Sequence, residues 1–283
     1  MRLTENSFSQ GDIKAFEPTM KVGVLATVND AGLPHLTLIS SLQAASPTEV
    51  IWGQFTEGLS KRHIRCNPKA GFLIMTLDKQ VWSGQATFTH TATQGKEYDA
   101  YNATPMFRYN AYFGVHTVYY MNLVRHSGRQ RLPMGSVIFA ALQTLVAKSL
   151  TQRPQGSKAM NLWTRRLLSG LNTLKFLSYL DDEGYPLIIP VIQAQAWGTD
   201  GLLFSTSAFH DALEEIPAGA PTALLGMALT MEDVLVRGTF RGIRRTAGIR
   251  CGIVDIDWVY NSMPPVPGQI YPPVALDAVT DFS

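Results

Sequence analysis

The chain has 283 residues, of which 46% are hydrophobic and 16% are charged, and its formal net charge is +2. This length suits two domains of ordinary size, each with a core of its own. The near-neutral charge argues against a nucleic-acid-binding surface spread over the molecule, so no nucleic-acid partner is predicted.

Cysteine use and the first residues both bear on localisation. Cys66 and Cys251 are the only cysteines. A disulfide framework is therefore not expected, and reduced thiols are typical of a cytoplasmic protein. The chain begins with polar residues and lacks the apolar stretch of a signal peptide, so a cytoplasmic localisation is predicted.

The first part of the chain has the pattern of short strands joined by turns. The predicted strands are residues 21–28, 35–42, 49–55, 70–77, 81–89 and 111–125. A polar stretch, residues 56–68, follows the third strand. It predicts a loop and then a short helix over residues 61–66, with Ser60 as the N-cap and Pro68 ending the helix.

Residues 134–173 have a helical pattern. They predict two helices, 136–150 and 158–171, separated by a run rich in helix-breaking residues. The apolar segment 135–150 is shorter than the ~20 residues of a membrane span and contains Lys148. We therefore predict no membrane span, and a helix packed between domains is favoured over a helix lying on a membrane.

The last part of the chain returns to the strand pattern and ends in a proline-rich tail, which predicts an extended arm. The predicted strands are residues 175–180, 187–196, 202–205, 222–229, 234–240 and 252–259.

The two strand-rich parts repeat one another at a constant offset. Gly32-Leu33-Pro34 matches Gly184-Tyr185-Pro186, and 184 − 32 = 152. A period this long indicates a repeated domain, that is, an internal duplication. The predicted fold is mainly β, with two tandem antiparallel barrels joined by a helical linker. The expected domains are residues 1–133, the linker 134–173 and a degenerate second copy, 174–283.

Four motifs in the first copy, taken in order, resemble those of a known family. They are Gly32-Leu33-Pro34, Ser60-Lys61-Arg62, a segment ending in Asn67-Pro68, and a segment beginning with Gln80-Val81. This order resembles the pyridoxamine 5'-phosphate oxidase-like, FMN-binding split-barrel superfamily. The resemblance implies six-stranded split barrels that work as a dimer with FMN in the cleft between them. A tandem chain would supply both barrels as an intramolecular pseudo-dimer, and a homodimer of such chains stays open.

The resemblance also implies where FMN binds. Its phosphate would lie against the loop and helix start after the third strand, and its ring along the second and third strands. A phosphate site needs hydroxyls, N–H groups and cations. The phosphate candidates are Thr56, Ser60, Lys61 and Arg62, and the choice of cation between Lys61 and Arg62 stays open. The ring candidates are Thr37, Ser40, Trp52, Gln54 and Gln80. Core packing is an equally good interpretation of Trp52, and Gln80 is equally compatible with a turn.

The second copy lacks the cationic loop. Its residues 204–215 contain no Lys or Arg and include Asp211, Glu214 and Glu215. At most one FMN per chain is therefore predicted, held by the first copy. The histidines are scattered without metal-ligand spacing, so no metal site is predicted.

The predicted function is that of a flavoprotein oxidoreductase that uses non-covalent FMN on a small-molecule substrate or electron donor. The alternative is a non-catalytic protein that binds or carries a flavin, a deazaflavin or haem. True pyridoxamine phosphate oxidase activity is not expected, because the C-terminal segment lacks that family's substrate-binding motif. No residue is assigned a catalytic role.

Overall fold

The computed structural model describes residues 2–55, 57–105, 114–153, 156–228, 232–261 and 268–273. The chain divides into two compact units. Unit 1 contains Met1–Leu132 and Leu180–Ile188, and unit 2 contains Pro133–Tyr179 and Ile189–Ser283. The helical segment after residue 133 thus belongs to unit 2, and a hairpin tip from the second half of the chain belongs to unit 1. The sequence did not predict this exchange.

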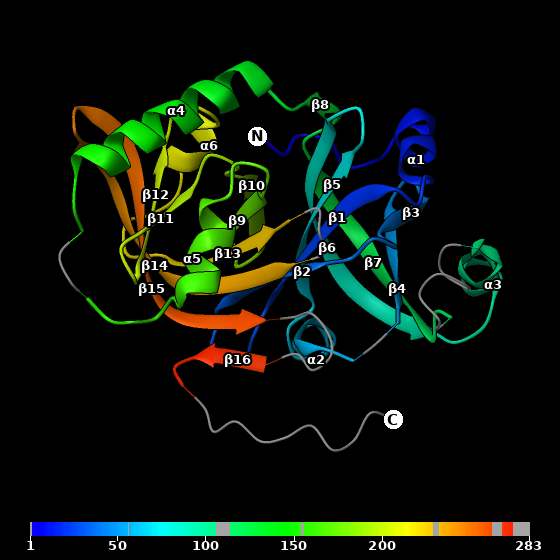
Figure 1. Ribbon diagram of the computed structural model, residues 1–283. Helices are drawn as coiled ribbons and strands as arrows, with labels where there is room; N and C mark the ends of the chain where they lie inside the picture. The colour runs from blue at the N-terminus through cyan, green and yellow to red at the C-terminus, as the bar shows by residue number, and fades with distance from the viewer. Residues whose placement is uncertain are drawn as a thin grey trace. The chain divides into compact units, whose positions relative to one another are not determined.

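Unit 1 is a curved antiparallel sheet with three helices (Figure 1). The strand order is β2-β1-β5-β6-β7-β4-β3, and β8 pairs with β6. No pairing joins β2 to β3 among the described residues, so the barrel is split at that point. The strands are β1 (Lys21–Val28), β2 (Pro34–Leu38), β3 (Gln43–Ser46), β4 (Glu49–Gln54), β5 (Lys69–Thr76), β6 (Gln80–Ala92), β7 (Thr117–His126) and β8 (Gln130–Arg131). The helices are α1 (Gln10–Phe16), α2 (Leu59–Cys66) and α3 (Lys96–Ala103).

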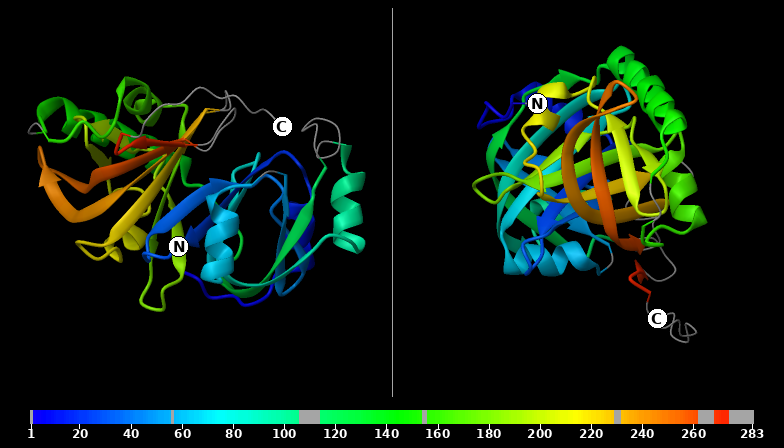
Figure 2. Two further views of the ribbon diagram at one scale, coloured as in Figure 1. Left: turned by 90° about the horizontal axis from the view of Figure 1, so that it is seen from below. Right: turned by 90° about the vertical axis from the view of Figure 1, so that its left-hand side faces the viewer.

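Unit 2 repeats this strand order element by element, as β10-β9-β13-β14-β15-β12-β11, and β16 pairs with β15. Figure 2 shows its strands curving around an interior, with α4 along the outer side. The predicted mainly β fold with two antiparallel barrels is therefore confirmed. The strands are β9 (Leu174–Leu180), β10 (Pro186–Pro190), β11 (Gln195–Trp197), β12 (Gly201–Ser205), β13 (Pro221–Met227), β14 (Asp233–Thr246), β15 (Ile249–Asn261) and β16 (Gly268–Tyr271). The helices are α4 (Met134–Leu150), α5 (Leu162–Ser169) and α6 (His210–Glu214).

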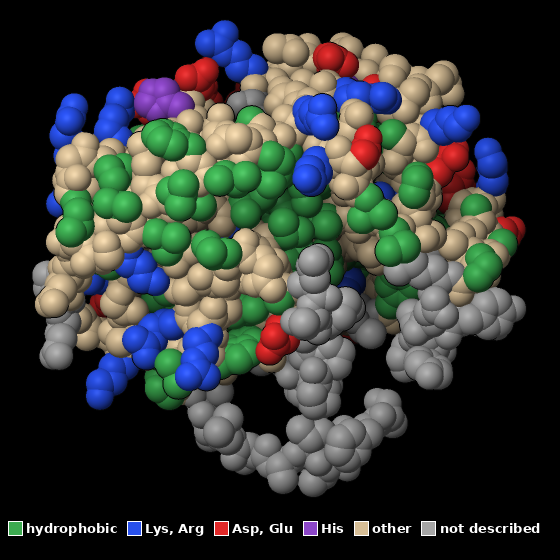
Figure 3. Space-filling view, turned by 45° about the horizontal axis from the view of Figure 1, so that its top comes forward, with side chains coloured by type: hydrophobic (Ala, Val, Ile, Leu, Met, Phe, Trp, Pro, Cys, Tyr) green, Lys and Arg blue, Asp and Glu red, His purple; other side chains and the backbone are tan. Residues whose placement is uncertain are grey.

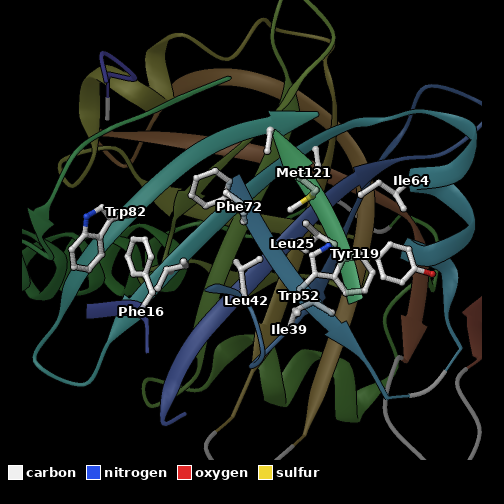
Figure 4. Close-up of a cluster of buried hydrophobic side chains, with 14 of the residues drawn as sticks. Phe16, Leu25, Ile39, Leu42, Trp52, Ile64, Phe72, Trp82, Tyr119 and Met121 are labelled. Carbon is white, nitrogen blue, oxygen red and sulfur yellow. The ribbon is translucent and has the colours of Figure 1, made fainter. Parts of the chain in front are cut away.

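Large aromatic side chains fill the interior of unit 1 (Figure 4). Trp52 on β4 and Tyr119 on β7 are fully buried and stack with ring centroids 4.0 Å apart at an interplanar angle of 10°. Gly84 on β6 leaves room for Phe72, because a Cβ at residue 84 would lie 2.3 Å from that ring. Stacking and close packing of this kind fix how the strands sit on one another.

The hairpin tip of residues 180–188 packs on β5, β6 and β7 within unit 1. The Asp181 carboxylate accepts hydrogen bonds from Gln85 (2.7 Å) and Arg125 (3.1 Å). Tyr185 exchanges a hydrogen bond of 2.7 Å with Thr87. The backbone approach is closest at Gly71, where a Cβ would lie 2.2 Å from the carbonyl oxygen of Pro186.

We expect Gly71→Ala to destabilise unit 1 by about 1–3 kcal/mol, because the new methyl group must displace backbone rather than a flexible side chain. Gly135→Ala is the matched control, since a Cβ at that residue meets nothing within 4 Å. Urea denaturation of the full chain measures both changes. Equal urea midpoints for the two variants would contradict the close packing of the hairpin tip on β5.

Candidate functional site

Helix α2 lies at the centre of the candidate site. It packs on β1 and β2, and its Ile64 side chain is fully buried in the core of unit 1 (Figure 4). Its N-cap is Gly58, and no side-chain hydrogen bond caps it within the described residues. The prediction of Ser60 as the N-cap was wrong, because the helix starts before it. No described side chain therefore accepts from the first N–H groups of α2.

The structure brings together two predicted site residues from different elements. The hydroxyls of Thr37 on β2 and Ser60 on α2 lie 2.5 Å apart. Side chains alternate along a strand, so Leu36 enters the core while Thr37 turns away from it toward the helix. Ser60 is 1% exposed. The pair places two hydroxyl groups beside the uncapped helix start.

Lys61 contributes a buried cation to the same place. The side chain is buried, and its Nζ would lie 3.5 Å from a Cβ on Gly58, so the ammonium reaches back to the N-cap. Burial lowers the pKa of Lys61, and the nearby Glu57 carboxylate partly opposes this shift. No hydrogen bond from this ammonium to a described residue is present. Arg62, the other predicted cation, is exposed.

A chain of hydrogen bonds borders the cation. Gln54 donates from Nε2 to Glu57 (2.6 Å) and accepts at Oε1 from the Tyr119 hydroxyl (3.0 Å). That hydroxyl in turn accepts from Arg65 at 3.0 Å. Glu57, Arg65 and Tyr119 were not among the site residues predicted from the sequence. The spacing of Lys61 and Arg65, four residues apart on one helix, was the available signal for Arg65.

The other predicted site residues do not all join this group. Trp52 is fully buried in the stack with Tyr119, and Ser40 is half-buried in the turn after β2. Gln80 is the first residue of β6 and follows the C-terminal end of β5, whereas α2 precedes the N-terminal end of β5. Because β5 has eight residues and is about 25 Å long, Gln80 lies far from α2. Thr56 lies outside the described residues.

The equivalent place in unit 2 is apolar. The offset of 152 holds on both sides of the loop, since β5 begins at Lys69 and β13 at Pro221 (221 − 69 = 152). With this offset, the residues of unit 2 equivalent to Thr37, Ser60 and Lys61 are Ile189, Ala212 and Leu213. All three side chains are buried. Unit 2 thus replaces the hydroxyl pair and the cation with hydrophobic packing.

No group of three or more His, Cys, Asp or Glu side chains is placed to hold a metal ion within the described ranges. No helix in the described part of the chain is long and apolar enough to cross a membrane.

Comparisons with known proteins give structural resemblance only. No family model and no curated protein matches the sequence. Among solved structures, the chain is similar to HupZ of Group A Streptococcus (19% identity, 42% of this chain and 91% of that one, TM-score 0.35). It is also similar to an FMN-binding protein of Syntrophomonas wolfei (13% identity, 41% of this chain and 82% of that one, TM-score 0.36). A third match is a candidate pyridoxamine 5'-phosphate oxidase of Lactobacillus delbrueckii (16% identity, 45% of this chain and 100% of that one, TM-score 0.36).

The chain resembles pyridoxamine 5'-phosphate oxidase-like split-barrel proteins in its motifs. Identities of 13–19% assign no activity to it.

We expect Tyr119→Phe to cost about 1–2 kcal/mol of stability, because Gln54 loses a buried donor while the ring stack on Trp52 remains. Tyr120→Phe is the control on the same strand, since its hydroxyl makes a longer bond of 3.3 Å to Glu97. Thermal or urea unfolding compares the two. A larger loss for Tyr120→Phe would contradict the role assigned to the Tyr119 hydroxyl.

Proposed function

We propose that unit 1 binds FMN non-covalently, with the flavin phosphate at the start of α2, and that the protein is an FMN-dependent oxidoreductase acting on a small molecule. The observation that carries the proposal is the buried ammonium of Lys61 at an uncapped helix start. The Thr37–Ser60 hydroxyl pair lies against the same helix start.

The electrostatics of this helix start favour an anion. The N-terminus of a helix carries a partial positive charge, so a buried cation placed there is disfavoured unless negative charge is close. Glu57 supplies some of that charge, but it is exposed and already accepts a hydrogen bond from Gln54. A phosphate would add about two negative charges and three acceptor oxygens for the N–H groups, the hydroxyls and Lys61. The exposed Arg62 is placed to add long-range attraction.

The chemistry of such a protein belongs mainly to its cofactor. A bound flavin supplies hydride or electron transfer, while the polypeptide supplies binding, orientation and electrostatics. In this chain, Lys61 and the helix start would hold the phosphate. Gln54 is the last residue of β4, and hydrogen bonds with Tyr119 and Glu57 hold its side chain in place. The resemblance implies that the flavin ring would lie along this strand. No described residue is assigned as a proton donor or acceptor.

The purified protein is expected to bind one FMN per chain, and to bind FMN more tightly than riboflavin, which lacks the phosphate. Lys61→Met should reduce the preference for FMN by about ten-fold or more while leaving riboflavin binding nearly unchanged, because only the phosphate contact is lost. Lys14→Met, at an exposed lysine of α1, is the control. Flavin fluorescence titration measures both ligands.

Two FMN per chain, or equal affinity for FMN and riboflavin in the unaltered protein, would overturn the proposal. Bleaching of the bound flavin by NADH or NADPH supports an oxidoreductase. A flavin that stays oxidised with every donor supports the carrier alternative.

FMN affinity is also expected to fall at alkaline pH. Burial lowers the pKa of Lys61 below its usual 10.5, so the free protein loses this positive charge at a lower pH than an exposed lysine would. Phosphate binding favours the charged form and therefore weakens as pH rises through the lowered pKa. Affinity measured across pH 7–10 in the unaltered protein and in Lys61→Met tests this, and the same slope in both would contradict it.

A further inference from the structure

Helix α4 of unit 2 has an apolar face on both of its sides. Its inner side packs on the sheet, where Ala147 joins Leu203 and Cys251 in a buried cluster and Thr144 accepts from the Ser205 N–H at 2.8 Å. Its outer side is also apolar. The exposed residues there are Ile138 (56%), Phe139 (56%), Leu142 (58%), Val146 (48%) and Leu150 (69%).

These exposed side chains form one ridge. Ile138, Leu142, Val146 and Leu150 follow each other at intervals of four residues, which places them along one side of a helix. Figure 3 shows hydrophobic side chains gathered over this part of the molecule. A contiguous exposed apolar patch of this kind is typical of an interaction surface rather than of ordinary solvent-exposed helix.

The segment that carries the ridge has charges of one sign. The sequence from Met134 to Leu180 contains no Asp or Glu. It contains the basic residues Lys148, Arg153, Lys158, Arg165, Arg166 and Lys175. Arg153 is neutralised by Asp200 and Asp255, and Lys175 is buried. Lys158 and Arg166 are exposed and have no salt bridge to a described residue.

Two of these cations, Lys148 and Arg165, lie together at the C-terminal end of the helix. Lys148, in the last turn of α4, donates to Ser169 at the end of α5 (3.2 Å). Burial, together with the charge of the nearby Arg165 guanidinium, lowers the pKa of Lys148. The Arg165 Nε is buried with no hydrogen-bond partner in the described part of the chain. The Glu232 carboxylate accepts a hydrogen bond from Trp163 of α5 (3.1 Å).

We propose that the outer face of α4, with the cations around α5, binds the surface of an anionic lipid membrane, with the helix lying in the plane of the interface. An apolar ridge flanked by Lys and Arg has the composition of interfacial helices. At 17 residues α4 is about 25 Å long, shorter than the ~30 Å hydrocarbon core, so the helix lies on the membrane and does not cross it.

Charge distinguishes this partner from a second copy of the chain. A two-fold interface places the same patch on both subunits, so the basic side chains of one copy would be brought close to those of the other. Like charges brought close together oppose association, whereas anionic lipid headgroups attract each basic residue near the membrane surface. The lipid surface satisfies both the apolar ridge and the positive charge.

Co-sedimentation of the full chain with vesicles tests the proposal. We expect binding to vesicles of equimolar phosphatidylcholine and phosphatidylglycerol, at least about ten-fold weaker binding to phosphatidylcholine alone, and weakening with added salt. Phe139→Ser with Leu142→Ser should reduce binding about ten-fold or more. Lys158→Glu with Arg166→Glu should remove the preference for anionic vesicles.

Matched controls alter exposed residues of unit 1. Met20→Ser with Leu77→Ser removes two side chains that are 66% and 72% exposed, and Lys14→Glu with Lys96→Glu reverses two exposed charges. Both should bind vesicles like the unaltered protein, and circular dichroism checks that every variant folds. No vesicle binding, or binding that the α4 variants do not change, would overturn the proposal. Dimerisation without vesicles that Leu142→Ser abolishes would assign the face to a second copy instead.

Discussion

The antiparallel pairing of β4 with β7 determines where the candidate site forms. Its register sets Trp52 opposite Tyr119 and Gln54 opposite Thr117. Trp52 and Gln54 lie on the same face of β4, so the stacked Tyr119 ring under Trp52 carries its hydroxyl to Gln54. The chain leaves β4 directly after Gln54 and enters α2 within a few residues. A shift of this pairing by one residue would therefore move Gln54 and the start of α2 together.

The two units use one strand order for different surfaces. Ile51 on β4 packs with Tyr101 of α3, while Leu203, at the equivalent position of β12 (203 − 51 = 152), packs with Ala147 of α4. The two covering helices come from different places in the chain, because α3 lies between β6 and β7 and α4 precedes β9. The repeat is thus kept in the strands, where pairing and core packing constrain every residue. It is lost in α3 and α4, which need only an apolar stripe that fits the sheet, whereas α5 and α6 follow α1 and α2 at nearly the same offset (162 − 10 = 152 and 210 − 59 = 151).

The sequence predicts what depends on local pattern and misses what depends on register. The strands β1 and β5 are near-continuous apolar runs and were predicted to within one residue. The helix α3 was missed because it has no apolar periodicity, and it is held by long-range bonds such as Tyr101 to the Ser41 carbonyl (2.6 Å). The order of the motifs assigned both Thr37 and Ser60 to one predicted FMN site. The Gln54–Tyr119–Arg65 chain was not predictable, because it joins residues 54 to 65 positions apart through strand register.

Buried lysines within the chain offer an internal comparison for Lys61. Lys175 donates to the carbonyls of Gly170 (2.8 Å) and Ile192 (3.0 Å), and burial, with the charge of Lys148, lowers its pKa to about 7. Lys21 donates to the Pro18 carbonyl (2.8 Å), and burial lowers its pKa to about 8.

Each of those two ammonium groups is stabilised by backbone oxygens close to it in sequence or structure. Lys61 is as buried as Lys21, at 7% exposure, yet it lies at a helix start, where N–H groups rather than carbonyls point outward. Among the described residues, no carbonyl accepts a hydrogen bond from the Lys61 ammonium as carbonyls do from the other two. The anionic ligand proposed for this site would supply both acceptors and negative charge.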